Sequence, residues 1–153
     1  MKNIVFRRIR IILLFGIAVI SFLSCSVGNE QIINGHFKGK ADIIVNWSVQ
    51  KELLFNLNID STNKVTGTIG NATITKGTIK KNIFGNTDYI INIDLSGYLI
   101  KDEKIKRSSI KIPFNYENGK IIGGFGTNGS KIGGKEDMIM SGTNLVLHKI
   151  LNL

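Results

Sequence analysis

The glycine-rich stretch from residue 119 to residue 134 contains the closest match in this chain to a phosphate-binding motif. Gly124 begins a G-x-G-x-x-G spacing, and Gly129 begins most of a G-x-x-x-x-G-K spacing. Such motifs bind phosphate where a helix follows, because its free amides and dipole then meet the anion. No helical pattern follows here, and an acidic residue stands where a magnesium-binding Ser or Thr is required. We interpret the segment as a flexible, exposed hairpin or rim loop, in which Lys131 and Lys135 are the candidates for anion binding.

The histidines of the chain are His36 and His148, one near each end of the expected domain. They would meet only if the first and last strands pair. Two ligands fall short of the three that a catalytic zinc site needs. Asp42 or Asp137 could complete a set, but no spacing requires it, so we predict no metal site and no cofactor.

Catalytic groups are weakly represented in the sequence. Serines are frequent, but none stands in a G-x-S-x-G elbow. The adjacent carboxylates Asp102 and Glu103, and likewise Glu136 and Asp137, would point to opposite faces of a strand or be solvated in a turn. We therefore predict no catalytic residue and no enzyme, with a hydrolase of dispersed site as the third choice.

Two aromatic residues, Trp47 and Tyr89, lie on the apolar parity of expected strands. In a hollow barrel they would line the cavity of a carrier for a small apolar ligand. In a packed barrel they would fill the core, which is the favoured interpretation because large aromatics dominate core burial.

The N-terminal residues have the organisation of a secretory signal. Residues 11–23 are apolar except for Ser21, which is short for a membrane span and fits the apolar region of a signal peptide. They follow a basic segment made of Lys2, Arg7, Arg8 and Arg10. We expect an exported chain in which residues 1–24 are the signal peptide.

The stretch Phe22, Leu23, Ser24 and Cys25 resembles the lipobox of bacterial lipoproteins. The resemblance implies cleavage before Cys25 and diacylglycerol on its thiol, which would anchor the chain to a membrane of the bacterial cell envelope, outside the cytoplasm. Cys25 is the only cysteine, so acylation would also remove an unpaired thiol from an exported protein. The alternatives are cleavage after Ser26 without lipid, and an uncleaved N-terminal helix.

Residues 25–35 are polar and are expected to be a tether, although two isoleucines in them could add a short strand. Residues 36–153 have the period-two alternation of half-buried strands. The segments with this pattern are 37–49, 53–59, 65–69, 72–79, 89–95, 110–114, 121–125 and 138–148. The sequence therefore predicts an all-β domain, an antiparallel meander of about eight strands forming a small β-barrel or a β-sandwich.

Short links and one proline refine this pattern. Gly70-Asn71 and Asn118-Gly119 predict tight turns. Pro113 lies inside a strand pattern and predicts an edge or a local bulge there, since proline has no amide donor. In length and strand rhythm alone, the domain resembles lipocalin-like and streptavidin-like barrels.

Net charge indicates the kind of partner. Without the four basic residues of the signal, sixteen basic residues face eleven acidic ones, a net charge of +5. This favours anionic headgroups or polyanions, whereas an exported chain without a basic helix is not expected to bind nucleic acid. We predict a non-enzymatic envelope lipoprotein that binds a partner, with a lipocalin-like carrier of a small apolar ligand as the alternative.

The lipid anchor predicts the behaviour of Cys25→Ala. This variant is expected to lose acylation and be released from membranes, because two or more acyl chains supply the stable attachment. Fractionation of detergent-free lysates measures it. A variant that still sediments entirely with membranes would mean that something other than lipid on Cys25 holds the protein.

Overall fold

The computed structural model describes residues 32–45, 48–101, 103, 106–129 and 140–151. Within these residues the chain forms eight strands and no helix, which confirms the all-β prediction. There is accordingly no described helix long and apolar enough to cross a membrane. The strands are β1 (Gly35–Ile44), β2 (Glu52–Ile59), β3 (Val65–Ile69), β4 (Ala72–Lys81), β5 (Tyr89–Ser96), β6 (Arg107–Glu117), β7 (Lys120–Gly129) and β8 (Met140–Ile150).

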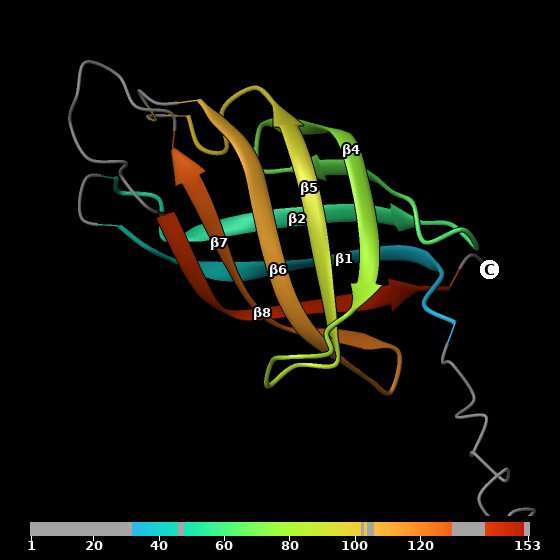
Figure 1. The fold of residues 1–153 in the computed structure, drawn as a ribbon. Helices are drawn as coiled ribbons and strands as arrows, with labels where there is room; N and C mark the ends of the chain where they lie inside the picture. Colours follow the sequence, from blue (N-terminus) through green and yellow to red (C-terminus); the bar gives the residue numbers. More distant parts are fainter. Residues whose placement is uncertain (1–31, 46–47, 102, 104–105, 130–139, 152–153) are drawn as a thin grey trace, which may run out of the picture. The chain divides into compact units, whose positions relative to one another are not determined.

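The strands form a closed antiparallel barrel (Figure 1). Each strand pairs with its successor in the sequence, and β1 pairs with β8, so of the two predicted architectures the barrel is correct. Closure gives every strand two neighbours and leaves no open sheet edge. All these pairings lie within residues 35–150, so the barrel has the contacts of a self-contained folding unit.

The barrel interior is apolar because one parity of each strand faces it. In β2 the odd-numbered residues from Leu53 to Ile59 are buried and the even-numbered ones are exposed, as the alternation predicts. In β1, Ile43 is buried while Lys38 and Lys40 are exposed. Each large apolar side chain buried in this way contributes about 1.5–3 kcal/mol.

Core side chains fill the interior. A side chain without accessible surface borders no space that a water molecule can enter. This holds for residues spread around the barrel wall, namely Phe37, Leu53, Leu57, Ile91, Ile112, Phe114, Ile121, Leu145 and Leu147. Edge-to-face contacts between Phe55 and Phe125, with ring centroids 5.7 Å apart, join opposite parts of the wall. The part of the interior that these residues line is therefore packed.

A bulge in β8 changes the parity of that strand. Asn144 has a φ of 53°, and the pairing with both β1 and β7 shifts by one residue beside it. Asn tolerates this left-handed conformation better than most residues. Period-two alternation over residues 138–148 predicts one face for Thr143, Leu145 and Leu147, and this is wrong for Thr143, which is exposed.

Two other segments differ from their predictions. The strand expected to continue to Val49 ends at Ile44, and Val49 is 87% exposed; it lies in a connection between strands. The glycine-rich stretch was predicted to be a hairpin or rim loop apart from the strand expected at 121–125, but β7 continues to Gly129. Gly123 serves close packing, because a Cβ at this position would clash with the carbonyl oxygen of Pro113.

Boundaries and turns follow the sequence closely. Ile33 is buried with the core, so the barrel begins three residues before the expected boundary at residue 36. Asn118 and Gly119 both have positive φ, which confirms the tight primed turn. Pro113 cannot lie in an edge strand, because the closed barrel has none. It is paired with Ile90 of β5, but on the other side of β6 it has no pairing partner in β7, where Lys111 and Phe114 are the nearest paired residues.

The connection between β5 and β6 folds over one end of the barrel. Leu99 and Ile100 are completely buried there, and the Leu99 carbonyl accepts a hydrogen bond of 3.1 Å from the amide of Asn71. The Glu103 carboxylate accepts one from the Leu99 amide at 3.1 Å and pairs with Nε of Arg107 at 2.6 Å. Both charged side chains are buried, so the expectation that Glu103 is a solvated turn charge is wrong.

The buried pair predicts that Glu103→Gln is strongly destabilising. The substitution removes the carboxylate charge that faces the buried guanidinium of Arg107. Breaking a buried ion pair in this way should lower the free energy of unfolding by about 3–5 kcal/mol. Urea denaturation measures the change. The matched control is Glu52→Gln, which removes an exposed ion pair with Lys40 and should leave the urea midpoint unchanged. Equal midpoints for the two variants would refute a structural role for the buried pair.

Candidate functional site

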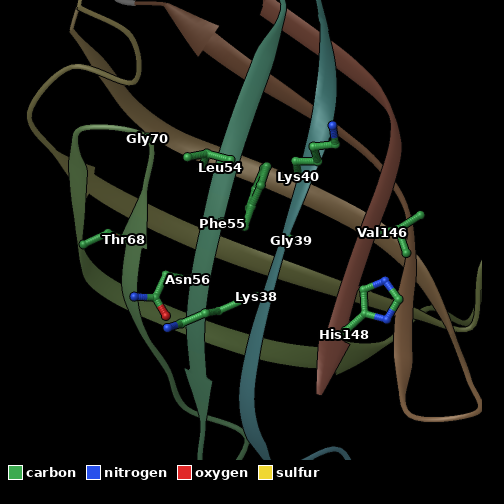
Figure 2. Close-up of a pocket in the computed structure, with 10 residues that line it drawn as sticks. All are labelled: Lys38, Gly39, Lys40, Leu54, Phe55, Asn56, Thr68, Gly70, Val146 and His148. Atoms are coloured by element: carbon green, nitrogen blue, oxygen red, sulfur yellow. The ribbon is translucent and has the colours of Figure 1, made fainter. Parts of the chain in front are cut away.

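A groove of about 700 Å³ runs across the outer wall of the barrel (Figure 2). Four neighbouring strands, β8, β1, β2 and β3, supply it, so it crosses the seam where the first and last strands meet. The residues that line it are Lys38, Gly39, Lys40, Leu54, Phe55, Asn56, Thr68, Gly70, Val146 and His148.

Strand register aligns the polar residues of the groove. His148 lies opposite Lys38, Lys38 opposite Asn56, and Asn56 opposite Thr68. These four residues form one row across four strands, which we call the polar row. Adjacent strands are about 4.8 Å apart, so the row is about 14 Å long. In Figure 2 the Lys38 side chain leans from β1 toward Asn56, and His148 stands on β8 on the other side.

A second row runs parallel to the polar row, two residues further along each strand. Lys40 pairs with Val146 on one side and with Leu54 on the other, and the Leu54 carbonyl accepts a hydrogen bond from the Gly70 amide at 2.7 Å. Leu54 is 64% exposed although it stands in the middle of a strand. The second row thus places apolar surface directly beside the polar row.

Two glycines are among the residues that line the groove. Gly39 lies between Lys38 and Lys40, and a Cβ at this position would clash with the backbone carbonyl of Val146. Gly70 has a positive φ of 54° and would clash with the Leu99 carbonyl in the same way. The glycines therefore allow neighbouring backbones to approach closely beneath the groove.

The groove is cationic. Lys38 is exposed, and within the described chain no salt bridge engages it. Lys40 hydrogen-bonds to the Glu52 carboxylate, and this bond together with the attraction of its charge raises the pKa of Lys40. The second histidine, His36, hydrogen-bonds through Nε2 to Oδ1 of Asn56 at the edge of the polar row. The groove can therefore bind an anionic group through charge-assisted hydrogen bonds.

Of the candidate ligand-, anion- and lipid-binding residues predicted from the sequence, Tyr89 is the one that the structure describes. Tyr89 is half-buried at the start of β5 and stacks on Phe114, with ring centroids 5.4 Å apart, so it packs against the core and not in the groove. Cys25, Trp47, Lys131 and Lys135 lie outside the described residues. The groove was missed because parity identifies outward-facing residues, but only register shows which of them are neighbours.

The two histidines do come near one another, because β1 and β8 pair. His148 is opposite Lys38, two residues from His36, and both histidines face outward. In the part of the chain that the structure describes, no group of three His, Cys, Asp or Glu side chains could hold a metal ion.

Comparisons with known proteins give no further guide to this chemistry. No protein-family model, curated protein or solved structure matches the chain. The function must therefore follow from the groove and from the barrel that carries it.

The close approach beneath the groove predicts that Gly39→Ala is destabilising. Its Cβ would push β8 away from β1, and overpacking of this kind costs about 1–3 kcal/mol. The control is Gly126→Ala in β7, where an added Cβ meets no atom within 4 Å. Thermal unfolding of both variants measures the difference. If Gly39→Ala unfolds at the same temperature as the parent chain, the seam is looser than the structure implies.

Proposed function

We propose that this protein is a lipid-anchored, non-catalytic binding protein of the bacterial cell envelope, and that its groove binds an acidic segment of a partner protein. The observation that carries the proposal is the polar row with Lys38 and His148, set beside exposed Leu54 on the outer wall. The anchor follows from the lipobox-like sequence ending at Cys25.

The packed interior favours partner binding over the carrier. A lipocalin-like carrier needs a hollow barrel, because its ligand binds in the cavity that the strands enclose. Here the barrel interior is lined by core side chains without accessible surface, on β1, β2 and β5 to β8. Binding therefore belongs on the outer wall, where apolar and cationic groups are exposed together.

The chemistry of the groove favours binding over hydrolysis. A hydrolase of the nucleophilic kind places a nucleophile within hydrogen-bond reach of a base. The titratable residues that line the groove are Lys38, Lys40 and His148. Lysines with an exposed apolar neighbour suit recognition of a carboxylate and an adjacent apolar side chain.

The spacing of the two rows indicates the form of the partner. The rows are two residues apart along each strand, which is about 6.8 Å. Alternate side chains of an extended peptide have the same separation and point the same way. An acidic residue over Lys38 and His148 would therefore bring the apolar residue two positions away over Lys40 and Val146, with Leu54 beside Lys40 on the next strand.

A short peptide tests this proposal. The probe is a capped pentapeptide with glutamate at its first and last positions, leucine in the middle and threonine between them. Titrated into the Cys25→Ala chain from residue 25 onward, it should shift amide resonances of β1, β2 and β8 in NMR spectra. Lys38→Gln together with His148→Gln should weaken binding about tenfold or more, because they remove the ammonium group of Lys38 and the ring N–H donor of His148 that would face the carboxylate.

The matched control removes two lysines from another part of the outer wall. Lys76→Gln in β4 together with Lys111→Gln in β6 takes away exposed positive charge outside the groove. This control should bind the peptide as the parent does. Equal weakening of peptide binding in both double variants would mean that net charge accounts for the effect, and it would reject the groove as the binding site.

A further inference from the structure

The barrel end at which β1 begins presents apolar and basic side chains together. We call it the tether end: it comprises the start of β1, the β2–β3 turn, the β4–β5 loop, the β6–β7 turn and the end of β8. In Figure 1 these segments lie at the right and the bottom of the barrel. In an up-and-down barrel all of them belong to the same end.

The β4–β5 loop presents two large apolar side chains to solvent. Phe84 is 99% exposed and Ile83 is 78% exposed. The termini of the described barrel add to this surface, with exposed Ile32, Ile150 and Leu151. An adjacent aliphatic and aromatic pair, fully exposed at a loop apex, indicates a surface that is covered when the protein works.

Hydrogen bonds hold the base of this loop. The amide of Asn82 donates to the Asp88 carbonyl at 2.8 Å, and its side-chain amide donates to Oγ1 of Thr87 at 3.0 Å. The amide of Asp88 donates to Oδ1 of Asn115 in β6 at 3.0 Å. The apex with Ile83 and Phe84 is therefore presented from a fixed base.

Exposed lysines surround the apolar apex. Lys80 and Lys81 end β4 directly before the loop, and Lys64 and Lys120 lie in or beside the other turns of this end. Asp60, an acidic residue of the β2–β3 turn, uses its carboxylate within the turn. It accepts hydrogen bonds from the hydroxyl and amide of Thr62 and from the amide of Lys64, and these bonds lower the pKa of Asp60.

We propose that the tether end docks on an anionic membrane surface, with Ile83 and Phe84 inserted at the level of the headgroups. Apolar side chains at a loop apex gain free energy by entering the interface, and each nearby lysine is attracted to anionic lipid. The positive charge of the expected mature chain is consistent with this partner.

The short tether selects this end of the barrel over the other. This step rests on the proposed lipid at Cys25. Eight residues lead from Cys25 to buried Ile33, and even fully extended they span at most about 29 Å. A strand of ten residues tilted by about 40° gives a wall about 25 Å high. Placing the opposite end on the membrane would require the tether to run almost fully extended along that wall.

Vesicle flotation with the Cys25→Ala chain from residue 25 onward tests the docking without the lipid. The barrel is self-contained, so this chain retains the whole tether end. It should float with vesicles of mixed phosphatidylcholine and phosphatidylglycerol, and not with pure phosphatidylcholine. Ile83→Ser together with Phe84→Ser should lower the partition coefficient about tenfold or more. Lys80→Gln together with Lys81→Gln should do the same, and added salt should mimic that second effect.

The control is Leu54→Ser, which removes exposed apolar surface from the groove wall and should leave flotation unchanged. All these positions are exposed, so the urea midpoints should also stay unchanged. Flotation that is equal for the parent and the Ile83, Phe84 double variant overturns the proposal. If the lipid-bearing full chain stays in membranes while the Cys25→Ala chain does not float at all, the anchor stands and the docking surface is rejected.

Discussion

Pairing between β1 and β8 is the interaction on which the rest of the structure depends. It closes the sheet, and closure creates the interior that the inward parity of every strand fills. The same seam requires a backbone without a side chain at Gly39, because the carbonyl of Val146 occupies the space of a Cβ. It also forms the groove, since the polar row exists only where His148 is registered against Lys38.

Local patterns predicted much of the fold because they act over a few residues. The alternation from Leu53 to Ile59 and the Asn118-Gly119 turn both match the structure. The choice between barrel and sandwich depends on contacts between the two ends of the chain, which alternation does not encode. The bulge at Asn144 similarly reversed the parity within one strand, so the prediction is correct after it, at Leu145 and Leu147, and wrong before it, at Thr143.

The candidate site was less predictable than the fold, because it depends on register. Lys38 and His148 are ordinary outward-facing residues in sequence and become neighbours only through closure. Glu103 and Arg107 are four residues apart, yet their burial depends on a connection that folds over the barrel end beside Leu99. Sequence motifs instead pointed to lysines near the glycine-rich segment, part of which is the strand β7.

The order of the strands along the chain would have a consequence for folding if the chain is exported as proposed. Most neighbouring strands can form hairpins early, because their partners are close in sequence. β1 must wait for β8, which is synthesised last and ends at Ile150, so closure has a high contact order and is slow. A chain that crosses a membrane unfolded would keep its first strand unpaired on one side until the last strand emerged. The topology itself would thus delay commitment to the native state until translocation is complete.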